Sequence, residues 1–354
     1  METTHKIYFK DSANMSEIES DSIDLIITSP PYPMIEIWDP LFSSLNSKIK
    51  QALEEKDGKR AFNLMHDELE KVWIELTRVL KKGGIVCVNV GDATRKISKN
   101  FQLFPNHVKI INSFQNKDYI ELPCILWRKP TNSPNKFMGS GMLPPNAYVT
   151  LEHEYILIFR KGNNIRDIPP KLENRYQSAF FWEERNKWFS DIWEDIKGTS
   201  QNLNRNNITQ KQLRDRSASY PLELPYRLIN MFSLYGDTIL DPFWGLGTTS
   251  LAAMILGRNS IGYEINYEFK DLFQKNLEAI KKLNIDINTN RINQHIDFIK
   301  NYKKKGKDFK YHSVYYKFPV VTKQEIEFLL YSIKSCNEDK GKFILTHQKF
   351  EFEQ

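Results

Sequence analysis

The stretch that decides the fold is Asp241–Thr249, which reads DPFWGLGTT. A short apolar segment ends at Asp241, glycines at 245 and 247 allow a tight turn, and we expect a helix from there to about Gly257. A strand, turn and helix in this order bring a ligand close to backbone N–H groups beyond the carboxyl end of the strand. The dinucleotide fingerprint is not complete because Ser250 replaces its third glycine, and no P-loop sequence occurs.

The next expected strand, Ser260–Tyr263, is followed by an acidic residue, Glu264. It lies roughly twenty residues beyond the glycine turn, the spacing at which an acid holds two ribose hydroxyls in nucleotide-binding folds. Because no pyrophosphate cradle accompanies it, the pattern predicts a nucleoside as the ligand.

A second motif, Thr28–Tyr32 (TSPPY), follows the short apolar segment Asp24–Ile27. Its two prolines fix the backbone and leave only carbonyl oxygens as hydrogen-bonding groups. Ser29 adds a hydroxyl acceptor and Tyr32 a ring for stacking. These groups suit a planar base with an exocyclic amino group, although a rigid proline turn with a packed tyrosine would have the same sequence.

Other segments alternate between helices and buried strands, which predicts an α/β fold with a parallel sheet covered on both faces. The expected elements are a helical stretch over Leu41–Leu80, strands at Ile85–Val90, Cys124–Trp127 and Tyr155–Phe159, and a helix over Leu222–Tyr235. From Gly162 to Ser217 the apolar periodicity is lost.

Composition excludes several classes of protein. With 40% hydrophobic and 27% charged residues, the 354-residue chain can bury a large core and is not disordered throughout. No apolar run approaches the roughly 18–20 residues that a bilayer span needs. The three cysteines, which stand far apart, make no metal-binding or disulfide pattern, so we expect no metal and a cytoplasmic location.

The two motifs together resemble one family, the DNA amino-methyltransferases that use S-adenosylmethionine. Such enzymes combine a D-P-F-x-G-x-G-T-T loop for the cofactor with an [S/D/N]-P-P-[Y/F] catalytic loop. The catalytic loop comes first here, as in the permuted class usually called beta. The serine at position 29 and the continuation Pro33–Asp39 are similar to members of restriction–modification systems that methylate cytosine at N4.

The resemblance implies a Rossmann-like, doubly wound sheet of the S-adenosylmethionine-dependent methyltransferase type with an inserted target-recognition region. It also implies roles for single residues. The catalytic residues would be Ser29, Pro30, Pro31 and Tyr32, and the cofactor residues would be Asp11, Asp241, Phe243, Gly245, Gly247, Thr248 and Glu264. Within that set, Glu264 would hold the ribose and Asp11 the adenine edge.

We expect four regions along the chain. Residues 1–161 form the catalytic half of the methyltransferase domain, 162–216 a target-recognition region, 217–283 the cofactor-binding half and 284–354 a basic C-terminal extension. From Lys270 to Gln354 there are 17 Lys and Arg against 11 Asp and Glu, a surplus equal to the net charge of +6 for the whole chain. A basic surface favours polyanions, although a lysine run is equally typical of a solvated tail.

Double-stranded DNA is therefore the expected partner, with a cognate restriction endonuclease as the genetic partner. The expected DNA contacts are Arg175, Arg185, Arg205, Lys303, Lys304, Lys305 and Lys307. The aromatic residues between Phe180 and Trp193 are expected mostly to form a small core, since large aromatic side chains usually pack.

Alternative functions differ in the methyl acceptor. Adenine N6 is chemically close to cytosine N4, and serine favours cytosine only by association. Methylation of RNA, a small molecule or a protein side chain is a different class of reaction, and a DNA-binding protein with a degenerate pocket is a non-enzymatic alternative. No cysteine follows a proline in a nucleophile-like loop, which argues against methylation of a ring carbon.

Overall fold

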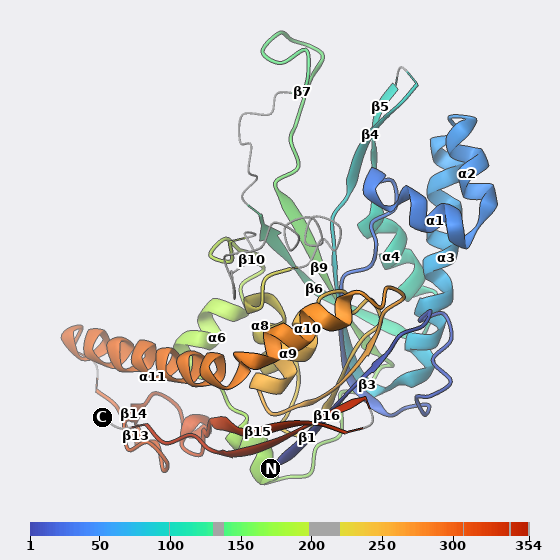
Figure 1. Cartoon of the computed structure of the whole chain (residues 1–354). Coiled ribbons are helices and arrows are strands. Elements are labelled where there is room, and N and C mark those ends of the chain that lie inside the picture. Colours follow the sequence, from blue (N-terminus) through green and yellow to red (C-terminus); the bar gives the residue numbers. More distant parts are fainter. Residues whose placement is uncertain (99, 130–137, 198–219, 307, 340, 353–354) are drawn as a thin grey trace.

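The structure is a computed structural model that describes residues 1–98, 100–129, 138–197, 220–306, 308–339 and 341–352. A ten-stranded sheet runs through the molecule (Figure 1). Its order is β10 (Ile192–Trp193), β6 (Tyr119–Arg128), β9 (His153–Lys161), β3 (Leu80–Val90), β2 (Ile23–Thr28), β11 (Thr238–Asp241), β12 (Asn259–Tyr263), β1 (Glu2–Tyr8), β16 (Lys342–Lys349) and β15 (Tyr331–Asp339).

The sheet is mixed, which corrects the expectation of a parallel one. Strands β3, β2, β11, β12 and β1 are parallel neighbours, as expected. In contrast, β9 is antiparallel to both β3 and β6, and β16 is antiparallel to both β1 and β15. Apolar runs such as Tyr155–Phe159 predict burial on both faces but not strand direction, because both directions bury the same side chains.

Helices cover both faces of the sheet, so the expected doubly wound α/β fold is confirmed. In β2, Ile26 faces the cluster that contains α3 (Gly58–Val79), whereas Leu25 and Ile27 face the cluster that contains α8 (Glu223–Phe232). The first face also carries α1 (Asp39–Leu45), α2 (Ser47–Glu54) and α4 (Asn106–Gln115). The second also carries α9 (Thr248–Ile255), α10 (Phe269–Glu278) and the start of α11 (Ile280–Lys304).

The helical stretch expected over Leu41–Leu80 is three helices, because polar residues cap two internal starts. The Asn46 side chain accepts a hydrogen bond from the Lys48 amide at 3.1 Å, and Asp57 accepts one from the Arg60 amide at 3.0 Å. Each cap satisfies a backbone donor that a helix start leaves unpaired. A buried stripe along α3 then holds this helix on the sheet.

The segment 162–216 is only partly described, and its described part packs into the body. It forms α5 (Glu173–Gln177), α6 (Trp182–Trp188) and β10, which pairs with β6. Phe181, Trp188 and Trp193 are buried, as expected for a small core. Glu184 of α6 binds Arg291 of α11 at 2.6 Å, which ties this segment to the C-terminal part of the chain.

The described residues from 284 onward contribute strands and part of a helix to the main fold. The expected boundary at 283/284 falls inside α11, and β15 and β16 complete one edge of the ten-stranded sheet. Between α11 and β15 lie β13 (Tyr311–His312), β14 (Pro319–Val320) and a 3-10 turn at Lys323–Glu325. None of the helices in the described ranges is long and apolar enough to span a bilayer.

Candidate active site

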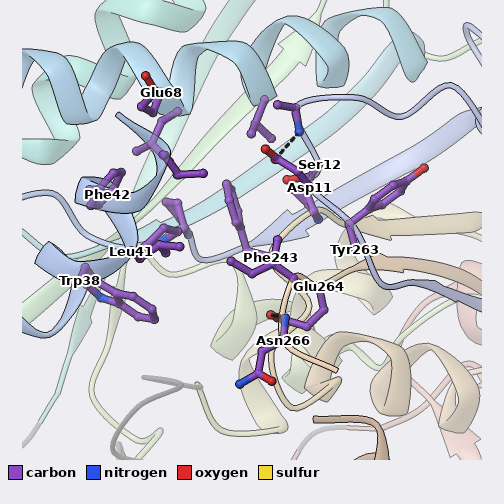
Figure 2. Close-up of a pocket in the computed structure, with 18 of the residues that line it drawn as sticks. Asp11, Ser12, Trp38, Leu41, Phe42, Glu68, Phe243, Tyr263, Glu264 and Asn266 are labelled. Atoms are coloured by element: carbon purple, nitrogen blue, oxygen red, sulfur yellow. Dashed lines mark hydrogen bonds between the residues drawn. The ribbon is translucent and has the colours of Figure 1, made fainter. Parts of the chain in front are cut away.

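A cavity of about 710 Å³ opens at the carboxyl ends of β2, β11 and β12 (Figure 2). One wall comes from the first helices and is mainly apolar, with Trp38, Leu41, Phe42, Leu69 and Val72 beside the charged Glu68 and Lys71. The opposite wall carries the loops that follow the three strands. Parallel strands place their carboxyl ends at the same edge, which is why motifs distant in sequence meet here.

Four of the seven expected cofactor residues line this cavity: Asp11, Phe243, Gly245 and Glu264. Glu264 accepts the Gly245 amide at 2.8 Å with one oxygen and the Asn266 amide at 2.8 Å with the other. Each carboxylate oxygen keeps a further lone pair for a hydroxyl group. Burial raises the pKa of Glu264 above its usual range. Figure 2 shows Phe243 between the apolar wall and Glu264, as a flat face beside the acid.

Asp241 does not line the cavity. Its carboxylate joins the end of β2 to the turn that follows β11. One carboxylate oxygen accepts Thr28 Oγ1 at 2.9 Å and the Phe243 amide at 3.1 Å. The other accepts Thr249 Oγ1 at 2.7 Å and the Tyr220 hydroxyl at 3.2 Å. Because four protein donors already occupy this buried carboxylate, its observed contacts fix the end of β2 against the turn after β11. A direct contact to the cofactor stays a prediction.

Gly247 and Thr248 also lie outside the cavity lining. Gly247 precedes α9 with φ at +74°, and a Cβ there would come within 2.5 Å of the Phe273 ring and 2.6 Å of the Trp244 ring. Its glycine is therefore required by packing. Gly245 has φ at +51°, and a Cβ there would make only an ordinary contact, at 3.9 Å from the Phe243 carbonyl oxygen, so its backbone can face the cavity directly.

The expected catalytic loop lines the same cavity with Ser29, Pro30 and Pro31. Behind it lies a hydrogen-bond network that the sequence did not reveal. The Tyr32 hydroxyl contacts Ser29 Oγ at 3.0 Å. It accepts a hydrogen bond from Asn89 Nδ2 at 2.9 Å and donates one to a Glu154 carboxylate oxygen at 3.1 Å. That oxygen also accepts Asn89 Nδ2 at 2.7 Å, and the second Glu154 oxygen accepts Lys129 Nζ at 2.9 Å.

The surroundings of Tyr32 determine the protonation state of its hydroxyl group. Its side chain is 9% exposed, and its ring lies against Gly91, where a Cβ would come within 3.1 Å of it. Burial, and then the Glu154 charge, raise the pKa of Tyr32 well above its usual value, so the phenol stays protonated. A protonated hydroxyl can donate one hydrogen bond and thereby orient Ser29 or Glu154. Stacking on a base stays a prediction.

The comparisons with known proteins agree with this geometry. Residues 23–275 match the model of the N6_N4_Mtase family, described as DNA methylase. The chain belongs to the N6/N4 DNA methylase family. It is 56% identical to the type II methyltransferase M.MthZI of Methanothermobacter thermautotrophicus, over 96% of this chain and 94% of that protein. It is 52% identical to M.MjaI of Methanocaldococcus jannaschii, over 82% and 97%.

A solved structure supports the expected methyltransferase fold of this N6/N4 DNA methylase. TTHA0409 of Thermus thermophilus, solved in complex with S-adenosyl-L-methionine, is 28% identical, with a TM-score of 0.60. The match covers 78% of this chain and 94% of that one.

Of the DNA contacts expected for this methylase, those that the structure describes do not line the cavity. Arg175 and Arg185 line a different pocket, together with Asp24 at the start of β2 and Gly83, and thus lie at the edge of the sheet opposite to Ser29. Lys303–Lys305 are exposed at the C-terminal end of α11. Arg205 and Lys307 lie outside the described residues. Their roles in DNA binding stay predictions.

Sequence reasoning gave Asn89, Glu154 and Lys129 no individual role, because each belongs to a separate segment. Their positions at strand ends were an available signal. Asn89 is near the end of β3, Glu154 is at the start of its antiparallel partner β9, and Lys129 directly follows β6. These three strand ends meet at the edge of the sheet that carries Ser29 because β9 runs antiparallel to β3 and β6, and the sequence alone does not specify that direction. Within the described ranges no group of three His, Cys, Asp or Glu side chains is placed to hold a metal ion.

Proposed function

We propose that this protein transfers a methyl group from S-adenosylmethionine to the N4 amino group of a flipped-out cytosine in double-stranded DNA. The observation that carries the proposal is that one cavity is lined both by Ser29, Pro30 and Pro31 and by Phe243 and Glu264. The type II methyltransferases to which it is 56% and 52% identical over the matched residues support DNA as the substrate and a restriction–modification system as the setting. The order of the two loops supports the beta class.

The cavity fits the cofactor by the chemistry of its lining. Glu264 offers carboxylate lone pairs for ribose hydroxyls, Phe243 and the apolar wall offer faces for an adenine ring, and Asp11 offers an acceptor at the cavity rim. When bound, the cofactor supplies a methyl group on a positively charged sulfur. The Asp11 carboxylate already accepts the Ala13 amide at 2.8 Å, so its loop is held in place (Figure 2).

The chain's own residues would prepare the nucleophile. The exocyclic nitrogen of cytosine is a poor nucleophile because its lone pair is delocalised into the ring. Ser29 Oγ and the Pro30 carbonyl would accept its two hydrogens, favour a pyramidal nitrogen and direct the lone pair at the methyl group. Transfer is then direct, without a covalent enzyme intermediate, and positioning and fixed dipoles supply most of the rate enhancement. The base must leave the duplex to reach Ser29.

The serine at position 29 supports cytosine over adenine as the target base, because the adenine-methylating enzymes of the family that the motifs resemble carry an aspartate at this position. Methylation of adenine N6 is the second candidate, since both amino groups are held by the same kind of acceptors. The location that fits either reaction is the cytoplasm, together with the DNA and a cognate endonuclease.

The test is a nucleoside digest, analysed by mass spectrometry, of DNA incubated with the protein and S-adenosylmethionine. We expect N4-methylcytosine, and none with the Ser29→Ala, Tyr32→Ala double variant. N6-methyladenine would refute the base assignment and keep the chemistry. No methylated nucleoside on mixed-sequence genomic DNA, with cofactor binding intact by calorimetry, would refute DNA as the substrate.

A further inference from the structure

Two hairpin arms rise from the edge of the sheet that carries the catalytic loop (Figure 1). The first arm is β4 (Ala93–Ile97) with β5 (Asn100–Phe104), which follows the end of β3. The second is β7 (Met138–Gly139) with β8 (Ala147–Tyr148), between the end of β6 and the start of β9. Strands β6, β3 and β2 run in the same direction. Both arms therefore begin at the edge of the sheet where β2 ends and Ser29 follows.

The roots of both arms contact the catalytic loop. At the root of the first arm, Gly91 lies against the Tyr32 ring, and a Cβ at this position would come within 3.1 Å of the ring. At the root of the second arm, Glu154 and Lys129 flank the segment that contains β7 and β8, and Glu154 contacts the Tyr32 hydroxyl. Farther out, Phe101 of the first arm stacks on Tyr148 of the second, with ring centroids 4.6 Å apart and an angle of 18°. The two arms therefore form one unit above the catalytic loop.

The tip of the second arm is apolar and exposed. Met142 is 84% exposed, Leu143 is 72% exposed, and prolines 144 and 145 follow them. The turn itself is held in shape: the Ser140 amide donates to the Asn146 carbonyl at 2.9 Å, and the Leu143 amide donates to the Ser140 carbonyl at 3.2 Å. Large aliphatic side chains on a shaped turn in full contact with water indicate a surface that becomes covered in use.

We propose that Met142 and Leu143 form an apolar wedge that enters the DNA duplex beside the target base and holds the gap that the flipped base leaves. Met, Leu and Pro are the side-chain types that proteins insert between base steps, where they unstack the bases and are covered by them. DNA is the occupant that the position favours, because the arms share their roots with the loop to which the base must travel. The proposal rests on the proposed function.

The first arm would stand beside the DNA backbone. Its base is anchored, because Arg95 binds both carboxylate oxygens of Asp39 in α1, at 2.9 and 2.7 Å. Lys96, the next residue, is exposed and can meet a phosphate group. An anchored arm with a cation and a second arm with an apolar tip would thus hold backbone and base step at the same time.

The experiment compares two duplexes that carry the sequence identified as methylated by the digest and by sequencing of modified DNA. One duplex has the target base correctly paired, and the other has a mismatch opposite it, which lowers the energy needed for flipping. We expect the Met142→Ser, Leu143→Ser double variant to lose at least tenfold in kcat/KM on the paired duplex and to recover most of that loss on the mismatched one. Ile74→Ser, which removes an exposed aliphatic side chain from α3, is the matched control and should leave both rates unchanged.

Three outcomes would overturn the wedge. The double variant could match the unchanged protein on the paired duplex, or it could lose equally on both duplexes, which would indicate a folding or binding defect. It could also change the molecular mass in light scattering without changing the ratio of the two rates, which would make the tip a contact between two copies of the chain. If the unchanged protein methylates no DNA, the proposed function fails, not the wedge alone.

Discussion

Glu154 connects the expected catalytic loop to the ends of the neighbouring strands β3 and β6. It accepts hydrogen bonds from Tyr32, Asn89 and Lys129. Replacing it by glutamine keeps the size of the side chain but removes the charge that Lys129 faces. We expect Glu154→Gln to lower kcat about tenfold, which corresponds to about 1.4 kcal/mol in the barrier, because Tyr32 and Ser29 lose their fixed orientation.

The measurement for Glu154 is steady-state methylation together with calorimetric binding of S-adenosylmethionine. Binding should stay within about twofold, since Glu154 does not line the cavity. Glu152→Gln is the matched control, because Glu152 lies in the same segment and makes an exposed ion pair with Arg128. An equal loss in both variants would contradict a specific role for Glu154.

Substitution can separate the ring of Tyr32 from its hydroxyl group. The ring is expected to stack on the base, and the hydroxyl group is hydrogen-bonded to Ser29. Tyr32→Ala removes both, and loss of the stacking alone should weaken base binding by roughly 1–3 kcal/mol. Tyr32→Phe keeps the ring, so we expect DNA affinity to be retained while kcat falls. A phenylalanine variant with full kcat would show that the hydroxyl network plays no part in the reaction, and full activity of the alanine variant would refute stacking.

At the scale of elements, the turn between β11 and α9 makes different demands on its two glycines. Gly247→Ala would bring a Cβ against Phe273 and Trp244 in a left-handed backbone conformation. We expect a loss of unfolding free energy of about 2–4 kcal/mol, from overpacking and the unfavourable backbone together. Gly245→Ala has the same kind of backbone but only an ordinary Cβ contact, so it should cost only about 1–2 kcal/mol in stability and should weaken cofactor binding instead.

Urea unfolding monitored by circular dichroism, with calorimetry for cofactor binding, checks this pair of variants. If both lost the same stability, Gly247 would not be distinguished by its packing. If Gly245→Ala bound S-adenosylmethionine normally, the backbone at that position would not face the cofactor.

The sequence predicted this turn well and the neighbouring site poorly, for one physical reason. The turn at Asp241–Thr249 is local, so its residues and spacing specify it. The network at Asn89, Glu154 and Lys129 arises where β3, β9 and β6 meet, and β9 is antiparallel to both of its neighbours. Strand pairing depends on contacts distant in sequence, which no single segment encodes.

At the scale of the whole molecule, the neighbouring strands β1 and β16 carry buried histidines. His5 and His347 both contact Thr3 Oγ1, at 3.0 and 2.9 Å. Burial lowers the pKa of His5 to about 3 and that of His347 to about 4. The unfolded chain therefore binds more protons below its ordinary histidine pKa of about 6.5, so stability is complete above that pH and falls as the pH drops toward 4.

Thermal unfolding across pH 4–8 measures this loss, with a slope of at most about 1.4 kcal/mol per pH unit for each buried histidine. His347→Gln should make the loss shallower. His312→Gln, at an exposed histidine, should leave it unchanged. An unaltered profile for His347→Gln would mean that this histidine is not a source of acid sensitivity.

The C-terminal basic residues illustrate what composition can and cannot predict. A surplus of positive charge was correctly located after residue 270, but the same residues also build α11, β15 and β16, which complete the fold. Alternation along β16 buries Phe343 and Leu345 against α10 and the neighbouring strands. Composition reports the charge of a surface, whereas the pairing of β16 with β1 joins opposite ends of the chain.

Lys303–Lys305 have two possible uses that salt titration distinguishes. As phosphate contacts they release counterions, and each neutralised lysine should reduce the steepness of log K against log salt by about 0.9 for duplex DNA. As residues at the C-terminal end of α11 they stabilise the helix by interacting with its dipole and leave the slope unchanged.

We expect the triple Lys→Gln variant of Lys303–Lys305 to flatten the slope in filter binding. Replacement of Lys281 and Lys282 in the first turn of α11 provides the control on the same helix. An unchanged slope with a lower melting temperature would assign the lysines to the helix end and leave the arms as the main DNA-facing surface.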